Sequence, residues 1–287
     1  MKIPESAKWI APPLAFIVAI LGYPTAFVLL LTLRDQTLLG SNVTWVGLQN
    51  YIEILGSEEF WEAFGNSAFF TLASILLQTF FGIGLAFLLN TKIRGARIAR
   101  TLVLYPYLIP TVVAAITFKW MFNEFFGIYS YALTWLGIFE SPKPLFGTYE
   151  LAMFGVILVT FWKFVPFITI FVVSRLATIP QHLYDQAKID GASALQTFRH
   201  VTWPELRNLV ILLVLMRSIW LFGVFDIVWN LTGGGPARVT ETLPILAYRQ
   251  AFESYELSQG ATTSVISFLI MFVCSVLYIH ASSKLER

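Results

Sequence analysis

Hydrophobic residues in this 287-residue chain gather into six long runs that are separated by shorter polar stretches. Each run is long enough for a helix to cross a hydrocarbon layer about 30 Å thick, which takes roughly 20 residues. A backbone inside a bilayer finds no water to bond, so the runs are predicted to be helices of a single all-α membrane domain, residues 1–287. The six predicted spans are approximately 9–33, 64–89, 101–122, 151–176, 209–231 and 260–281.

Composition places the chain outside the soluble proteins. Hydrophobic residues make up 57% of it and charged residues only 13%, whereas soluble domains carry about a quarter charged residues. The sequence has no G-x-x-x-x-G-K-[ST] phosphate loop, and its histidines, cysteine and carboxylates lack the spacing of a metal site. We therefore expect neither catalytic residues nor a metal site. Gly82 and Gly84 fall inside a span, where close helix packing is their expected role.

The loops on the two sides of the predicted spans differ in their content of lysine and arginine. The basic residues on the richer side are Lys2, Lys8, Lys92, Arg94, Arg97, Arg100, Arg175, Lys188, Arg199, Arg207, Lys284 and Arg287. Those on the opposite side are Arg34, Lys143, Arg238 and Arg249. Because cytoplasmic loops are enriched in lysine and arginine, both termini are predicted to be cytoplasmic. The net charge of +2 reflects this topology and gives no case for binding nucleic acid.

The cytoplasmic connection 177–207 is polar and amphipathic, unlike the spans on either side of it. Pro180 is predicted to end the fourth span, since proline disfavours the helical conformation in the residue before it. Two short helices are expected with a bend at Gly191, and Pro204 is expected to stop the second before the fifth span. By itself this pattern also fits an ordinary linker with an interfacial amphipathic helix.

The same connection carries a specific resemblance. The pattern E-A-A, three residues, G, nine residues, I-x-L-P is typical of the permease subunits of binding-protein-dependent ABC importers. Here Asp185-Gln186-Ala187 precedes Gly191 by three residues, and nine more lead to the segment 201–204 (VTWP). The spacing is intact, although Asp185 is one methylene shorter than the usual glutamate.

A second set of segments is similar to carbohydrate-importing permeases, and to the first permease of maltose-type and glycerol-3-phosphate-type importers in particular. These segments are 48–51 (LQNY), 230–236 (NLTGGGP), 240–243 (TETL) and 248–252 (YRQAF). The resemblance covers essentially the whole chain. It implies the ABC type I importer permease fold, in the plasma (inner) membrane of a bacterium or archaeon, and import of a carbohydrate or sugar derivative.

The resemblance also implies partners. These are a second permease subunit, two cytoplasmic ATPase subunits that bind ATP and magnesium, and an extracytoplasmic solute-binding protein, so that no cofactor is expected in this chain itself. The connection 177–207 would be the coupling loop, with Asp185 facing a basic residue of the ATPase. The residues implied to contact the ATPase are Asp185, Ala187, Gly191, Ala192, Phe198 and Pro204.

Ionisable residues inside a membrane usually face a cavity, and Lys163, Arg217 and Asp226 lie in predicted spans. Helical spacing places Arg217, Trp220 and Val224 on one polar and aromatic face, which suits sugars. Family positions that contact sugar correspond to Thr160, Lys163, Phe164, Phe167, Arg217, Trp220, Leu221 and Val224, and the predicted pathway adds Asp226 and Asn230. Two alternatives for Lys163 and Arg217 stay open. In the first they are structural, and either pairs with Asp226 or caps backbone carbonyl groups beside Pro166. In the second they attract an anionic sugar.

Other functional classes explain less of the sequence. An ion-coupled secondary transporter predicts inverted repeats and paired broken helices, which the sequence does not show, and a membrane enzyme needs a clustered catalytic set. Within the ABC importers, the alternative is a permease for a non-sugar solute such as a polyamine or phosphate. The Gly-Gly-Gly-Pro loop argues against that alternative, while the particular carbohydrate is not determined by this sequence.

Overall fold

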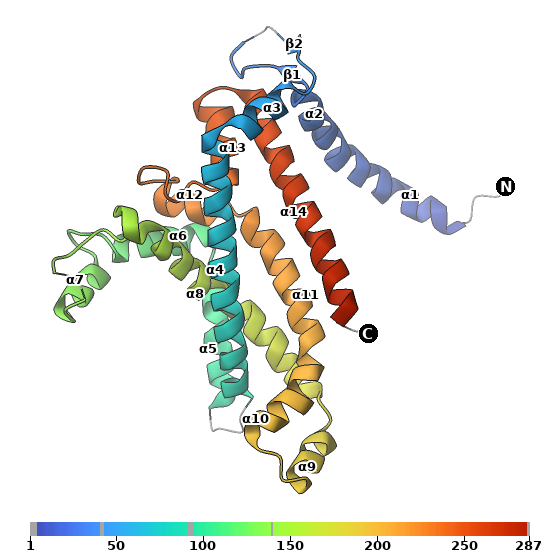
Figure 1. The fold of residues 1–287 in the computed structure, drawn as a ribbon, viewed down its shortest axis with the longest axis vertical. Coiled ribbons are helices and arrows are strands. Elements are labelled where there is room, and N and C mark those ends of the chain that lie inside the picture. The colour runs from blue at the N-terminus through green and yellow to red at the C-terminus, as the bar shows by residue number, and fades with distance from the viewer. Residues whose placement is uncertain (1–4, 41–42, 91–94, 139, 286–287) are drawn as a thin grey trace. The chain divides into compact units, whose positions relative to one another are not determined.

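The computed structural model describes residues 5–40, 43–90, 95–138 and 140–285. The chain forms two compact units: residues up to Ala63 with Leu243–Ile270 make the first, and Phe64–Thr242 with the residues from Met271 onward make the second. The regular structure of the described residues is helical, as predicted, apart from one pair of two-residue strands (Figure 1).

The first unit combines helices from both ends of the chain with the small sheet. Its helical elements are α1 (Glu5–Ile17), the π-helical turn η1 (Val18–Gly22), α2 (Tyr23–Leu31), α3 (Gln49–Gly56), α13 (Leu243–Tyr248), the π-helical turn η3 (Arg249–Glu253) and the first part of α14 (Leu257–Leu285). Strands β1 (Arg34–Asp35) and β2 (Thr44–Trp45) pair antiparallel. The Asn50 side chain on α3 donates to the carbonyl oxygens of Thr32 and Arg34, which ties α3 to β1.

The second unit is built around α8, half of whose residues are buried. Its described elements are α4 (Glu58–Leu89) from Phe64 onward, α5 (Ala96–Leu108), α6 (Thr111–Met121), α7 (Ile128–Trp135), α8 (Tyr149–Thr178), α9 (Gln181–Ile189), α10 (Ala194–Thr197), the π-helical turn η2 (Phe198–Thr202), α11 (Trp203–Phe222), α12 (Asp226–Thr232) and the last part of α14. Helices α5, α6, α11 and α12 pack against α8.

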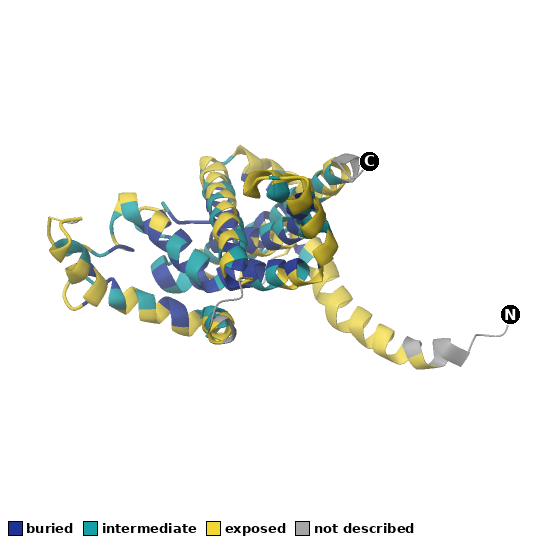
Figure 2. Ribbon diagram, turned by 90° about the horizontal axis from the view of Figure 1, so that it is seen from below, coloured by how far each residue is buried: buried dark blue, intermediate teal, exposed yellow. Residues whose placement is uncertain are grey.

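Four described helices are long and apolar enough to cross a membrane, and there are up to six spans if each of two bent pairs counts as one. The predicted spans 9–33, 64–89, 151–176 and 260–281 correspond to α1–α2, α4, α8 and α14. The segment Pro12–Leu31 is almost wholly exposed (Figure 2), which suits a helix that faces lipid or another subunit.

The single helices predicted over 101–122 and 209–231 are each broken. Helices α5 and α6 meet at an angle of 92°. The continuous helix Ala194–Phe222, which ends with α11, meets α12 at an angle of 48°. Pro110 holds Ile109 in an extended conformation, and Pro180 likewise ends α8, as predicted. The second break falls after Gly223, a poor helix former, and a new helix begins at Asp226, whose negative charge is favourable at a helix N-terminus.

Prolines follow two of the π-helical turns. Pro24 lies in the first turn of α2 directly after η1, and Pro204 lies in the first turn of α11 directly after η2. A proline ring clashes with the carbonyl group four residues earlier, and the wider π-helical turn relieves that clash. The expectation that Pro204 stops the second short helix is therefore wrong, because α10, η2 and α11 are continuous over Ala194–Phe222.

The two glycines expected to allow close helix packing differ in their surroundings. A Cβ on Gly82 would lie 2.8 Å from the Ile168 side chain of α8, whereas a Cβ on Gly84 would meet nothing within 4 Å. We expect Gly82→Ala to destabilise the α4–α8 packing by about 1–3 kcal/mol, as overpacking does. Gly84→Ala should cost nothing, since alanine is the better helix former. Thermal unfolding of the purified variants measures the difference, and equal melting temperatures would contradict the close approach.

Candidate functional site

Helices α9 and α10 form a corner that connects α8 to α11 (Figure 1). Helix α9 ends in a Schellman motif, in which Gly191 has φ +70° and donates its N–H to the Lys188 carbonyl group. The N–H of Ala192 donates to the Ala187 carbonyl group and completes the motif. Ser193 then caps α10 as part of a capping box. The predicted bend at Gly191 is confirmed, and hydrogen bonds at both helix ends fix its shape.

Four of the residues predicted to contact an ATPase lie at this corner. The Asp185 side chain is 57% exposed on α9 and forms an ion pair with Lys188 at 3.6 Å. Ala187, Gly191 and Ala192 line a hollow of about 420 Å³. The corner therefore presents a shaped surface with a carboxylate beside it.

Phe198 and Pro204, the other two predicted contacts, lie along the continuous helix beyond the corner. The Phe198 ring packs edge-on against Phe87 of α4, with 5.7 Å between the ring centroids. Pro204 occupies the first turn of α11. The structure thus gives Phe198 a packing partner within this chain.

Two contacts that were not predicted brace the corner. Arg175 near the end of α8 pairs with the Glu205 carboxylate at 2.6 Å and also donates to the Glu205 carbonyl oxygen at 2.9 Å. The hydroxyl oxygens of Tyr184 and Thr202 lie 3.3 Å apart. Opposite charges at the two ends of a helical connection are a pattern that would have indicated the first contact. No comparable pattern indicates the second.

Five of the predicted pathway residues form a cationic and aromatic cluster in the second unit. The Arg217 guanidinium lies 4.4 Å from the centre of the Phe164 ring, and the Lys163 ammonium lies 5.3 Å from it. The rings of Phe167 and Trp220 are each 5.7 Å from the same guanidinium. Arg217 is 2% exposed and Trp220 is 49% exposed, so the cluster reaches the surface of the chain through the indole ring.

Both bases of the cluster have partners within the chain. The Nε of Arg217 donates to Oε1 of Gln78 on α4 at 3.1 Å. The Nζ of Lys163 donates to the carbonyl oxygen of Ile109, at the break between α5 and α6. The alternative of an ion pair with Asp226 is not realised among the described residues. The alternative of capping a backbone carbonyl is realised for Lys163, at a different break from the one expected.

The remaining predicted pathway residues have other surroundings. Thr160 is buried and its hydroxyl bonds to the backbone of its own helix, and Leu221 is buried as well. Val224 lies in the break after α11, so it does not continue the helical face that its spacing predicted. Asp226 is exposed in the first turn of α12, and the side chain of Asn230 donates to its carbonyl oxygen at 2.7 Å.

Gln78 and Tyr107 belong to the cluster but were not predicted. The Tyr107 ring lies 6.2 Å from the Phe164 ring and 6.0 Å from the Phe167 ring. Gln78 is fully buried and, like Arg217, keeps one nitrogen without a hydrogen-bond partner among the described residues. A stripe of buried polar residues at helical spacing on α4 would have indicated Gln78. This stripe comprises Ser67, Thr71, Ser74 and Gln78.

The fold and the site together define a class of protein. It is a multi-span helical membrane protein with a buried cationic cluster and an exposed helical corner, features expected of a transport subunit. Residues 78–286 match the family described as binding-protein-dependent transport system inner membrane components. The chain belongs to this family.

Named relatives cover most of the chain. The trehalose/maltose transport system permease protein MalF of Thermococcus litoralis is 34% identical over 86% of this chain and 82% of its own length. The diacetylchitobiose uptake system permease protein DasB of Streptomyces coelicolor is 31% identical over 96% of this chain and 86% of its own length. A chain in the crystal structure of a bacterial ABC transporter for the acidic polysaccharide alginate superposes with a TM-score of 0.86 at 18% identity, covering 98% of this chain and 95% of that one. This likeness confirms the importer permease fold.

Proposed function

We propose that this chain is a permease subunit of an ATP-driven ABC importer, which moves a carbohydrate or sugar derivative across the plasma membrane of a bacterium or archaeon. An extracytoplasmic binding protein delivers the oligosaccharide, glycoside or polyol. The observation that carries the proposal is the 34% identity, along 86% of the chain, to a permease named for trehalose and maltose. A second relative, named for diacetylchitobiose, supports the same class of substrate.

The proposal includes one permease domain with six spans and with both termini in the cytoplasm. Each bent pair of helices then counts as one span. The excess of lysine and arginine on one side of the spans supports this orientation. Of the basic residues behind it, Lys2, Lys92, Arg94 and Arg287 lie outside the described residues.

The α9–α10 corner is proposed to dock on one of two cytoplasmic ATPase subunits, which supply the ATP and magnesium. The hollow lined by Ala187, Gly191 and Ala192 provides a shaped contact, and the exposed Asp185 offers a carboxylate to a basic residue. Docked in this way, the corner moves when the ATPase dimer closes.

That movement has a path into the membrane helices. The pair between Arg175 and Glu205 joins α8 to α11 next to the corner, and these two helices carry the cationic and aromatic cluster. Phe198, which packs against Phe87 of α4, and Pro204 both lie on the continuous helix that leads from the corner into α11. The transmission is therefore mechanical, through elements that are packed together.

The cationic and aromatic cluster is proposed to line the translocation pathway, which a second permease subunit completes. The half-exposed Trp220 and its neighbour Phe167 offer flat faces on which the C–H groups of a sugar ring pack. The other proposed pathway residues are Thr160, Lys163, Phe164, Arg217, Leu221, Val224, Asp226 and Asn230. The two cations also suit an anionic sugar derivative.

Reconstitution tests the proposed function. The proteoliposomes hold this chain, a second permease and two ATPase subunits. We expect them to accumulate carbohydrate only when ATP is present on the ATPase side of the membrane and a binding protein is present on the other side. Maltose, trehalose and diacetylchitobiose are suitable first substrates. Uptake without ATPase subunits, driven by an ion gradient, would indicate a secondary transporter. ATP-driven uptake of a polyamine or of phosphate, but not of sugars, would indicate a permease for a non-sugar solute.

A further inference from the structure

Arg217 and Gln78 each carry a buried nitrogen that lacks an acceptor. The Nη2 of Arg217 and the Nε2 of Gln78 have no hydrogen-bond partner within the described part of the chain. The amide of Gln78 is not reversed, because the Nε of Arg217 donates to its oxygen at 3.1 Å, and a nitrogen in that place would face another donor. Both spare nitrogens can only donate, and a buried donor without an acceptor is costly.

The two spare donors lie beside the one hydrogen bond that joins these residues. The Nη2 of Arg217 shares its carbon with the Nε that donates, and the Nε2 of Gln78 shares its carbon with the oxygen that accepts. This connectivity keeps the two nitrogens close to each other, one on α11 and one on α4. A single acceptor of sufficient size is therefore able to contact both.

Helix α4 adds hydroxyl groups that are also unused. The side-chain oxygens of Thr71, Ser74 and Thr79 are buried and have no partner in the described structure. Hydroxyl groups in a helix often bond to a carbonyl group of the preceding turn, as those of Thr160 and Thr169 do on α8, at 2.7 and 3.0 Å. Ser74 and Gln78 are four residues apart, so they share a face of α4. A third donor thus lies one helical turn from the spare amide nitrogen.

The positive charge of Arg217 has no carboxylate beside it. None of the ion pairs found among the described residues includes Arg217, which is 2% exposed. The rings of Phe164, Phe167 and Trp220 attract the guanidinium. Ring faces offset only part of the cost of burying an unpaired ion, and charges inside membrane segments are generally paired. The site therefore needs a negative charge as well as an acceptor.

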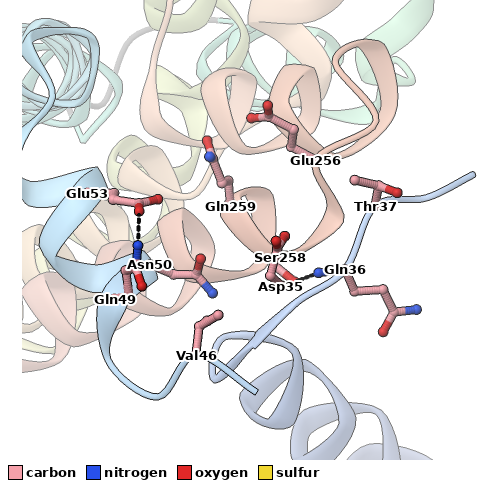
Figure 3. Close-up of a pocket in the computed structure, with 10 residues that line it drawn as sticks. All are labelled: Asp35, Gln36, Thr37, Val46, Gln49, Asn50, Glu53, Glu256, Ser258 and Gln259. Carbon is pink, nitrogen blue, oxygen red and sulfur yellow. Dashed lines mark hydrogen bonds between the residues drawn. The ribbon is translucent and has the colours of Figure 1, made fainter. Parts of the chain in front are cut away.

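Burial limits what can supply that charge. Gln78 is fully buried, so neither the sugar nor a carboxylate of another subunit reaches its nitrogen in this structure. The polar hollow of the first unit is different, because its carboxylates belong to exposed residues and are served by solvent (Figure 3). These are Asp35, Glu53 and Glu256. The acceptor beside Arg217 is instead a small species that the helices enclose, either water or an ion.

We infer that a small monovalent anion of the size of chloride binds between α4 and α11, where it accepts from Arg217 and Gln78. Ser74 is the third donor to it. Water would satisfy the donors but would add no charge, whereas an anion does both. We call the place formed by Ser74, Gln78 and Arg217 the anion site. The inference goes beyond the proposed function and does not rest on it, since an ion that joins two helices stabilises the chain whatever the chain transports.

Thermal unfolding of the purified transporter in nanodiscs tests the anion site. The melting temperature is compared in sodium chloride, sodium bromide and sodium gluconate at equal ionic strength. Gluconate is too large for an enclosed site of this kind. We expect the melting temperature to be about 2–4 °C higher in chloride and in bromide than in gluconate, because a ligand that binds only the folded state stabilises it.

Gln78→Glu shows where the ion binds. The substitution keeps the shape of the side chain and puts a carboxylate beside Arg217, so that the chain supplies its own negative charge. We expect this variant to melt at the same temperature in chloride and in gluconate, and no lower than the parent does in gluconate. Gln250→Glu is the matched control, because Gln250 is also buried and accepts a hydrogen bond from Thr263 in the first unit. It should keep the difference that the parent shows between the two salts.

Bromide gives a measurement that needs no variant. In crystals of the parent transporter grown with sodium bromide, we expect an anomalous scattering peak within contact distance of the spare nitrogens of Arg217 and Gln78. If Gln78→Glu fails to assemble, Ser74→Ala should still lower the stabilisation by chloride, since it removes one donor.

Three results would overturn the anion site. Equal melting temperatures of the parent in halide and gluconate would assign the enclosed acceptor to water. A halide effect that persists in Gln78→Glu would place the ion elsewhere, and so would a crystal without a bromide peak at Arg217. Each of these leaves the proposed function intact, because none of them concerns uptake. Failure of ATP-driven sugar uptake would contradict the proposed function and leave the anion site standing.

Discussion

Gly191→Asp is expected to abolish ATP-driven uptake while leaving the chain folded in the membrane. Gly191 has φ +70°, and a Cβ added there meets nothing within 4 Å. The cost to the fold is then confined to the left-handed backbone, about 1–2 kcal/mol for a residue with a Cβ and less for aspartate. The added side chain, however, lies at the hollow that Gly191 and Asp190 line, and it brings bulk and a further negative charge to the proposed docking surface. A loss of about 2 kcal/mol of docking free energy lowers affinity for the ATPase more than tenfold.

Gly137→Asp is the matched control for this variant. Gly137 has φ +75°, a Cβ there also meets nothing within 4 Å, and the residue follows α7 rather than the corner. It carries the same backbone strain without the docking surface, so its uptake should stay within about twofold of the parent. Uptake assays in proteoliposomes compare the two variants at equal membrane content. Equal losses would assign the effect to strain, and normal uptake by Gly191→Asp would remove the corner from the coupling step.

The features that were predicted from the sequence depend on short stretches of chain. A run of about 20 apolar residues is a local property, so the positions of α4, α8 and α14 could be predicted. The corner could be predicted as well, because the left-handed turn at Gly191 depends on that residue itself. Pro110, which causes the break between α5 and α6, lies inside an unbroken apolar run. The span was predicted from hydrophobicity alone, so the break was missed.

The features that were missed depend on distant parts of the chain. Arg217 and Gln78 are 139 residues apart, and only the packing of α4 against α11 shows that they bond. An ion pair of Asp226 with Lys163 or Arg217 was considered because all three are ionisable residues in predicted spans. The break between α11 and α12 separates Asp226 from Arg217, and Asp226 is left exposed at the start of a new helix. Ion pairs therefore cannot be predicted from the order of charged residues in the sequence where a span bends.

Arg217→Met is expected to lower both thermal stability and uptake. The guanidinium donates to Gln78 at 3.1 Å, and Gln78 is fully buried. Removing the donor leaves the Gln78 oxygen unpaired, which costs about 1–3 kcal/mol. Methionine fills much of the same volume between Phe164 and Trp220, so no large cavity adds to that cost. The melting temperature of the purified assembly should fall by a few degrees.

The double variant Arg217→Met/Gln78→Leu separates stability from transport. It removes both polar partners at once, and replacing buried polar partners by apolar groups is often neutral or stabilising. We therefore expect its melting temperature to return to that of the parent, with uptake still at least about tenfold lower, because the sugar has lost a charged hydrogen-bond donor worth about 1.5–3 kcal/mol. Gln78→Leu alone completes the double-mutant cycle.

The two measurements decide between a structural and a transport role for Arg217. If the double variant recovers uptake together with stability, Arg217 serves the packing of α4 against α8 and α11 and is not part of the pathway. If stability returns and uptake does not, Arg217 has a role in transport. This role would explain why a buried cation is present without a carboxylate partner among the described residues. Uptake of a neutral and an anionic sugar by the double variant then distinguishes the substrates. A larger loss for the anionic sugar assigns the guanidinium to its negative group, and equal losses assign it to the hydroxyl groups that both sugars share.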